Sequence, residues 1–406
     1  MDAPDLLLLQ PAAAPAPAGG SVPDMVRILR KHLGMDVAFV AELRQDLREI
    51  RLVDTDERDC PVQPGTCTPI EETYCRLVID GTLPELMPDI TAFPAATALP
   101  IAAQLGIASY LSAPIRLADG TIYGTLCCYS HAPDATLGVR DLAMIRACAE
   151  MTAIQVERQQ AQTRRRREIE DRVRSVLAPE RITMVYQPIY DVPKRAVAGF
   201  ESLSRFDDAC GRPPDVLFNE AHEVGLGMPL ETKAVQLGLS GLQHFAPEVY
   251  VSVNASPETI LDPAFGHAVD HAPLDRVTLE VTEHAAVNRY REIEAALAPL
   301  RWRGMQLAVD DAGAGYASFR HILQLAPDRI KLDCSLIRDI DTDPARRALI
   351  AAFVRFGEET GASLIAEGVE RDAELKVLQD LGVHKVQGYL LGRPMPLAQA
   401  ARLAQR

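Results

Sequence analysis

The chain has 406 residues, of which 48% are hydrophobic and 24% are charged, and its formal net charge at pH 7 is −14. This length and composition exclude a disordered or fibrous protein and allow two or three domains that each bury a core. The acidic balance argues against a nucleic-acid-binding surface, because backbone phosphates require clustered lysine and arginine.

Residues 1–21 are rich in alanine and proline and predict a disordered tail. The longest early apolar run, Leu6 to Leu9, is too short to span a membrane and lacks a basic flank. We therefore expect a cytosolic protein with no membrane contact. The cysteines show no C-x-x-C spacing and are expected to be mostly reduced, buried thiols. They are Cys60, Cys67, Cys75, Cys127, Cys128, Cys148, Cys210 and Cys334.

Residues 22–155 mix helical and strand patterns and predict one compact α+β domain. VRILRKHLG has helical spacing, and VAFVAEL and REIRLVDT alternate as strands do. PIRLADGTIYGTLCCYS predicts a hairpin whose turn is Ala118-Asp119-Gly120, with glycine supplying a positive φ. Together with the preceding PIEETYCRLVIDG, this hairpin resembles a GAF domain, a sensory module of signalling proteins. The resemblance leaves the ligand unknown, and a ligand-free dimerisation scaffold stays open.

Residues 139–176 contain helix-forming residues without proline or glycine and predict a long helix, in which residues 156–176 connect two domains. The apolar spacing is only roughly heptad, but it is compatible with pairing between two copies, so we expect a homodimer. The basic run from Arg164 to Arg167 is interpreted as a solvated face.

From residue 177 to the end, short apolar runs are separated by helical stretches. The runs are TMVYQP, AVAGFES, VYVSVN, VTLEVTE, QLAVDD, RIKLD, SLIAEGVE and HKVQGY. Their near-continuous Val, Ile and Leu content is typical of parallel strands covered by helices on both faces. Eight such units in about 230 residues predict a TIM-like (β/α)8 barrel, whose functional site lies at the carboxyl ends of the strands. The expected fold class is α/β, with a smaller α+β domain before the long helix.

Nearly every run closes on a side chain that can bind metal or donate a hydrogen bond. These are Gln187, Glu201, Asn254, Glu280 with Glu283, Asp310 with Asp311, Lys331 with Asp333, Glu367 with Glu370, and Gln387. In a closed barrel they would converge, and their repulsion would raise several pKa values unless cations are bound. Oxygen ligands without His or Cys favour Mg²⁺ or Mn²⁺ over zinc. A carboxylate bridging two ions, for which Asp310 is the candidate, is typical of two-metal phosphoester hydrolysis.

Simpler interpretations exist for single residues. Asp311, Asp333 or Glu370 could each be a helix N-cap, and Asn254 could start a helix. Lys331 could neutralise Asp333 as an ordinary ion pair. The occurrence of such residues at the ends of eight successive strands favours a shared site.

The motifs GFESLSRF, VSVNASP, LEVTE, DDAGAGYAS, IKLD, IAEGVE and VQGYLLGRPMP occur in the order that is typical of an EAL domain, the cyclic di-GMP phosphodiesterase module. The resemblance covers about residues 177–402, with Ser202 replacing the signature alanine, and we assign residues 177–406 to this domain. It implies hydrolysis of cyclic di-GMP to linear pGpG with two Mg²⁺ or Mn²⁺ ions per site.

The same resemblance implies roles for individual residues. Metal ligands would be Glu201, Asn254, Glu280 and Asp310 for the first ion, and Asp310 and Asp311 for the second. Lys331 would position the water, Glu367 would assist in its activation, and Asp333, Gln187 and Gln387 would complete the polar shell. Substrate contacts would come from Arg205, whose fork suits phosphate, and from Leu203, Glu370 and Pro394. Glu283 would anchor the loop after the paired aspartates.

That loop departs from the family pattern by losing an aromatic residue at Ala312 and hydroxyls at Ala314 and Ala317. Lost aromatic packing could loosen it. A catalytically weak or inactive cyclic di-GMP receptor that signals through a partner is therefore the alternative, and an unrelated metal-dependent barrel enzyme is a third. We expect the GAF-like domain to regulate the barrel through the connecting helix.

Overall fold

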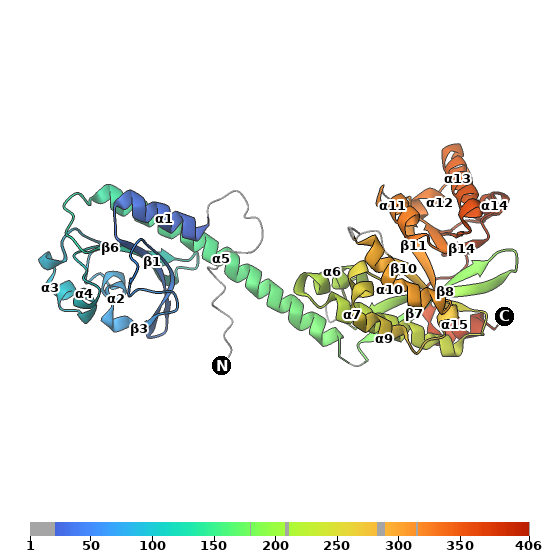
Figure 1. The fold of residues 1–406 in the computed structure, drawn as a ribbon, viewed down its shortest axis with the longest axis horizontal. Coiled ribbons are helices and arrows are strands. Elements are labelled where there is room, and N and C mark those ends of the chain that lie inside the picture. Colours follow the sequence, from blue (N-terminus) through green and yellow to red (C-terminus); the bar gives the residue numbers. More distant parts are fainter. Residues whose placement is uncertain (1–20, 179, 208–210, 282–288, 314–315, 406) are drawn as a thin grey trace. The chain divides into compact units, whose positions relative to one another are not determined.

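The computed structural model describes residues 21–178, 180–207, 211–281, 289–313 and 316–405 (Figure 1). The predicted tail lies outside these residues except for Ser21, which caps the first helix. The chain divides into two compact units, with the boundary between Arg165 and Arg166. Among the helices of the described residues, none is long and apolar enough to cross a membrane.

The first unit is built on a six-stranded antiparallel sheet with the order β3-β2-β1-β6-β5-β4. The strands are β1 (Val37–Arg44), β2 (Leu47–Thr55), β3 (Cys67–Pro69), β4 (Leu86–Met87), β5 (Ser109–Arg116) and β6 (Ile122–Ser130). The predicted hairpin is the β5–β6 pair, and Gly120 has a φ of +85° in its turn. Glycine adopts this conformation without the steric cost that other residues incur.

Alternating side chains of the sheet supply two cores. On β1, Phe39 and Ala41 belong to one cluster, while Ala38 and Val40 belong to the other. The first cluster contains residues of the short helices α2 (Tyr74–Ile79), α3 (Pro94–Thr97) and α4 (Pro100–Gln104). The second contains residues of α1 (Val22–Leu33) and of the first half of α5 (Val139–Val176).

The long helix was predicted over residues 139–176, and α5 has these bounds. Its last turns belong to the second unit, where Ile169, Val173 and Val176 pack in a cluster with Leu217 and Leu230. The cysteines of the described residues are all free. The expectation of burial is wrong for Cys67 and Cys334, which are exposed, and Cys210 lies outside the described residues.

The second unit is a closed barrel with the strand order β14-β13-β12-β11-β10-β9-β8-β7, in which β14 also pairs with β7. The strands are β7 (Ile182–Asp191), β8 (Ala196–Phe206), β9 (Tyr250–Ala255), β10 (Val277–Val281), β11 (Gln306–Ala312), β12 (Arg329–Leu332), β13 (Ser363–Ala366) and β14 (Lys385–Gln387), with β15 (Met395–Pro396) added to β7. The predicted TIM-like barrel is therefore confirmed. One strand departs from the expected parallel arrangement, because β7 runs antiparallel to both β8 and β14. Only residues 192–195 connect β7 to β8, and a parallel crossover requires a much longer connection.

Helices lie outside the strands (Figure 1), and the buried faces of those from Gly227 onward join one large core cluster with the barrel. The helices are α6 (Pro214–Val224), α7 (Gly227–Ser240), α8 (Pro257–Leu261), α9 (Pro263–Val269), α10 (Tyr290–Trp302), α11 (Tyr316–Leu325), α12 (Cys334–Ile337), α13 (Pro344–Thr360), α14 (Asp372–Asp380) and α15 (Leu397–Leu403). Leu217 and Ala221 of α6 pack instead with the end of α5. Near the amino ends of the parallel strands, the Arg329 guanidinium stacks 3.7 Å from the centre of the Tyr250 ring. Lys331, two residues after Arg329, points to the same face of β12, toward the carboxyl ends of the strands.

Candidate active site

Lys331 on β12 is the centre of the polar cluster in the barrel. Its side chain is 1% exposed, and its Nζ lies within salt-bridge distance of three carboxylates on other strands and of Glu367, directly after β13. The distances are 2.8 Å to Glu280 Oε2, 2.8 Å to Glu367 Oε1, 3.0 Å to Asp310 Oδ1 and 3.6 Å to Glu201 Oε2. The barrel thus brings together acids that are up to 166 residues apart (Glu201 to Glu367).

Amides orient the Glu201 carboxylate. Asn254 Nδ2 donates to Glu201 Oε1 at 3.3 Å, and Gln387 Nε2 donates to Glu201 Oε2 at 2.6 Å. The remaining amide oxygen of Gln387 is buried and has no hydrogen-bond partner. It is an acceptor that a bound water or ligand would satisfy.

Ser252 is a site residue that the sequence interpretation missed. Its hydroxyl donates to Glu280 Oε1, and the residue is 1% exposed. The signal was available, because Ser252 precedes Asn254 by two positions on β9 and such residues share a face of a strand. Ser252 therefore fixes the orientation of one candidate metal ligand.

Burial and mutual repulsion change the acidity of this cluster. Desolvation raises the pKa of Glu280 to about 8, with Glu201 and Asp310 adding repulsion and Lys331 opposing it. Desolvation likewise holds the pKa of Glu367 well above its ordinary value. Burial disfavours the Lys331 ammonium, but the surrounding carboxylates hold its pKa well above its ordinary value. One lysine therefore does not balance the acids, and protons are retained unless another cation is present.

The paired aspartates lie at a distorted end of β11. The β11–β12 register shifts between Val309 and Ala312, and Asp311 has a φ of +53°, in the left-handed region. Such a conformation in a non-glycine residue is strained and is common at functional sites. The Asp311 backbone N–H donates to Asp310 Oδ1 at 3.0 Å. Ligand atoms of Asp310, Asp311 and Glu367 lie within 4.8 Å of one another.

Two other groups of side chains in the described part of the chain are as close together, but one includes a histidine and an arginine contacts the other. Asp339, Asp341 and Glu374 are bridged by Arg371 Nη2 at 3.0, 2.7 and 2.9 Å. Arginine stays charged at all ordinary pH values, so this group has a permanent counter-charge, and Asp339 is also exposed to solvent.

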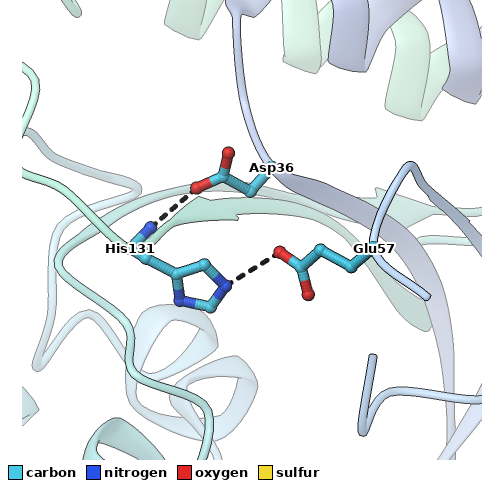
Figure 2. A group of neighbouring side chains, drawn as sticks. All are labelled: Asp36, Glu57 and His131. Carbon is cyan, nitrogen blue, oxygen red and sulfur yellow. Dashed lines mark hydrogen bonds and ion pairs between the residues drawn. The ribbon is translucent and has the colours of Figure 1, made fainter. Parts of the chain in front are cut away.

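The third group, in the first unit, is Asp36, Glu57 and His131 (Figure 2). His131 Nε2 lies 2.8 Å from Glu57 Oε1, and the His131 backbone N–H donates to Asp36 Oδ2 at 2.9 Å. The other ring nitrogen lies 2.9 Å from the Gly106 carbonyl oxygen. Both ring nitrogens are thus engaged, so this group is a hydrogen-bonded ion pair.

We expect the His131 pair to make a small, pH-dependent contribution to stability. The Gly106 bond and the Glu57 carboxylate raise the His131 pKa, so its contribution is fully present below pH about 6.5 and is lost as pH rises through the folded value. The ring is 44% exposed, so the pair is worth less than about 1 kcal/mol. An NMR titration should give a pKa above about 6.5, which Glu57→Gln lowers and the exposed Glu71→Gln does not. An unchanged His131 pKa in Glu57→Gln would contradict the pairing.

The other predicted site residues have varied surroundings. Asp333 caps α12 by accepting from the Ser335 backbone N–H at 3.0 Å, as the N-cap alternative proposed. The alternative pairing of Lys331 with Asp333 is wrong, because the partners of Lys331 are the four acids given above. Gln187 Nε2 donates to the Gly392 carbonyl oxygen at 3.4 Å. Glu370 is exposed and Pro394 is half-buried.

A pocket of about 210 Å³ is lined by Asn254, which donates to Glu201, but by none of the four acids around Lys331. Leu203, Arg205 and Asn254 are among its lining residues, so two of the predicted substrate contacts share a cavity with a predicted metal ligand. The Arg205 side chain is at the exposed end of β8 and donates to the Ser204 carbonyl oxygen at 2.8 Å. Glu283 and Ala314 lie outside the described residues, and Ala312 is fully buried in the barrel core.

The fold and the cluster define a barrel protein with an acidic, oxygen-rich site. Residues 170–394 match the EAL domain, and residues 22–156 match the GAF domain. The chain therefore belongs to the EAL domain family and carries a GAF domain before it.

Named relatives share the barrel portion. Cyclic di-GMP phosphodiesterase PA2567 of Pseudomonas aeruginosa is 29% identical over 228 residues, which are 52% of this chain and 38% of that protein. Probable cyclic di-GMP phosphodiesterase PdeD of Escherichia coli is 29% identical over 232 residues, which are 54% of this chain and 43% of that protein. The solved PaMucR phosphodiesterase in complex with c-di-GMP has a TM-score of 0.52 and 25% identity, covering 57% of this chain and 99% of that one. The chain spans only about a third of several curated relatives that it matches.

Proposed function

We propose that this protein hydrolyses cyclic di-GMP to linear pGpG with two divalent metal ions. The observation that carries the proposal is the cluster of Glu201, Glu280, Asp310 and Glu367 around Lys331 inside an EAL barrel. Relatives with the same barrel are named as phosphodiesterases of this dinucleotide.

The donor set fits hard divalent cations. Carboxylates and the Asn254 amide supply oxygen, and the residues in contact with Lys331 include neither histidine nor cysteine. This chemistry favours Mg²⁺ or Mn²⁺. Glu201, Asn254, Glu280 and Asp310 would hold one ion, and Asp310 with Asp311 would hold the other. Bound ions would lower the pKa of the attacking water and stabilise charge on the phosphate and the leaving oxygen.

The protein's own side chains supply positioning and proton transfer. Lys331 would donate a hydrogen bond to the attacking water from within the cluster. Glu367, 2.8 Å from Lys331, would accept a proton from that water. The water's oxygen bonds to phosphorus as one phosphorus–oxygen ester bond breaks, and a proton ends on the leaving ribose oxygen. Gln387, whose amide oxygen lacks a partner, is available to hold a water, and Gln187 and Asp333 would complete the shell.

Substrate contacts would lie next to the acids. Arg205 and Leu203 line the pocket that includes Asn254, and the guanidinium fork suits a phosphate oxygen pair. Glu370 and Pro394 would contact a guanine. Binding the bases at a distance from the reacting phosphate would fix its orientation.

Chromatographic measurement of cyclic di-GMP breakdown, with Mg²⁺ or Mn²⁺ and with a chelator, tests the proposal. We expect linear pGpG to form with metal and to be absent with the chelator. Binding of cyclic di-GMP without turnover under all metal conditions would favour the receptor alternative. Failure to bind the dinucleotide at all would favour an unrelated metal-dependent barrel enzyme.

Regulation by the GAF domain and pairing into a homodimer through α5 complete the proposed function. The supporting feature is that α5 is one uninterrupted helix whose residues pack in cores of both units. An uninterrupted helix can transmit a change in one core to the other, because its backbone hydrogen bonds resist local deformation.

Deleting residues 1–165 is therefore expected to change the rate of turnover or its dependence on metal concentration. The measurement compares kcat and KM of the full chain and of residues 166–406, with the oligomeric state of both determined by light scattering. Equal kinetic parameters in the two proteins would refute regulation by the first unit.

A further inference from the structure

Two buried cysteines of the first unit lie at one end of a directed hydrogen-bond chain. Cys75 on α2 and Cys127 on β6 are both 0% exposed. Tyr110 Oη donates to Cys127 Sγ at 3.1 Å, and Cys127 Sγ donates to Thr125 Oγ1 at 3.2 Å. Thr125 Oγ1 then donates to Cys75 Sγ at 3.1 Å. Every donor in the chain points toward Cys75, so its sulfur is placed as a hydrogen-bond acceptor, as a thiolate is.

The same core contains a buried arginine, Arg48, for which the described residues offer no carboxylate partner. Arg48 is 5% exposed, its Nε has no hydrogen-bond partner, and Nη2 donates to Thr68 at 3.2 Å. Its guanidinium lies 5.8 Å from the centre of the Phe39 ring, and Phe39 pairs with Cys127 in the β1–β6 register. A buried guanidinium remains charged and requires a counter-charge, because desolvating an isolated ion is very costly.

The surroundings of Cys75 favour the charged thiolate form of its side chain. The neighbouring Cys127 thiol, opposed by burial and assisted by the Arg48 charge and the Thr125 hydroxyl, lowers the pKa of Cys75 to about 5. The next residue after Cys127 gives a contrast: Cys128 faces the opposite core, where burial raises its pKa. Position relative to Arg48 and Thr125, rather than burial alone, therefore distinguishes Cys75.

We propose that Cys75 and Cys127 form a redox-active dithiol that reacts with small uncharged peroxides, with Cys75 as the attacking sulfur and Cys127 as the resolving one. The Cys75 thiolate attacks one peroxide oxygen, the sulfur–oxygen bond forms as the oxygen–oxygen bond breaks, and the released hydroxide or alkoxide takes up a proton. Cys127 then attacks the sulfenic acid, the disulfide forms, and water leaves with the Cys127 proton. The dithiol loses two electrons and the peroxide gains them. A small neutral oxidant is specified because both sulfur atoms are shielded from solvent.

This inference concerns the first unit and is independent of the proposed hydrolysis. The experiment treats the reduced full-length protein with hydrogen peroxide at pH 7 and quantifies each cysteine by differential alkylation and peptide mass spectrometry. We expect a Cys75–Cys127 linked peptide that is lost in Cys75→Ser. In Cys127→Ser the sulfenic acid should persist at Cys75 and be captured by dimedone. Cys128→Ser is the matched control and should react as the unchanged protein does.

The role of Arg48 is tested by measuring the rate of Cys75 oxidation. Arg48→Met should slow Cys75 oxidation at pH 7 by about tenfold or more, because the thiolate fraction falls when the pKa returns toward about 8.5. Arg48→Lys, which keeps the charge, should retain most of the rate. If Arg48→Met does not fold, the comparison of Cys75→Ser and Cys127→Ser with Cys128→Ser decides whether the dithiol reacts as proposed. Oxidation of the exposed Cys67 or Cys334 while Cys75 stays unmodified would overturn the proposal.

Discussion

Replacing Asp310 with asparagine is expected to lower the rate of cyclic di-GMP hydrolysis by about 100-fold or more and to weaken the binding of Mn²⁺. Asp310 lies 3.0 Å from Lys331 Nζ and forms a close group with Asp311 and Glu367, so it is the carboxylate best placed to serve two ions. Changes in the shell behind metal ligands already cost about 10- to 100-fold, and loss of a shared ligand should cost more. Enzyme assays and calorimetric Mn²⁺ titrations give the two readouts.

The matched control is Asp339→Asn. Asp339 also belongs to a group of three acids in the second unit, but Arg371 bridges those acids. This variant should keep both Mn²⁺ binding and turnover. Wild-type Mn²⁺ binding in Asp310→Asn would show that the ions are held elsewhere, and unchanged turnover would refute the proposed role of Asp310.

Replacing Lys331 with methionine is expected to destabilise the second unit strongly in the absence of metal. Within the described residues, Lys331 is the cation that contacts these four carboxylates, and removing one partner of a buried ion cluster costs about 3–5 kcal/mol. For a unit of this size the Tm should fall by roughly 6–20 °C. Calorimetry in the presence of a chelator measures the change, and turnover should also be lost.

The effect of Lys331→Met should depend on metal and pH in a defined direction. Mn²⁺ should restore part of the lost stability, because it supplies positive charge to the same carboxylates. Glu280 and Glu367 have raised pKa values, so their contribution to stability is present when they are protonated and is lost as pH rises through the folded values. The deficit of the variant should therefore grow between pH 6 and pH 8. The exposed Lys194→Met is the control, and an equal Tm loss in both lysine variants would contradict this account.

The eight barrel strands could be predicted because each is a distinct apolar run with a polar residue near its carboxyl end. The direction of the first strand was missed, although its signal was present: residues 192–195 are too few for a crossover helix. The long helix was predicted with the observed bounds, because residues 139–176 contain no proline or glycine that would interrupt it.

The ion-pair partners of the charged residues were harder to predict from the sequence. Lys331 and Asp333 are two residues apart, which suggested an ion pair, but Asp333 lies at the start of α12 and accepts a backbone hydrogen bond there. The cysteines give a similar case. Cys127 and Cys128 are neighbours in sequence with the same burial, yet they face different cores.

By itself, the sequence determined the order of the elements, the barrel, the connecting helix and the residue types that can bind a divalent cation, since these depend on local hydrophobic periodicity and on motifs a few residues long. Only the tertiary structure decided which acids share Lys331, that Ser252 orients Glu280, and that Thr125 links Cys75 and Cys127 in the core that contains the buried Arg48. The physical reason is that charge interactions and desolvation act through space over a few ångströms. Barrel closure and sheet register set those distances between residues that are far apart in the chain.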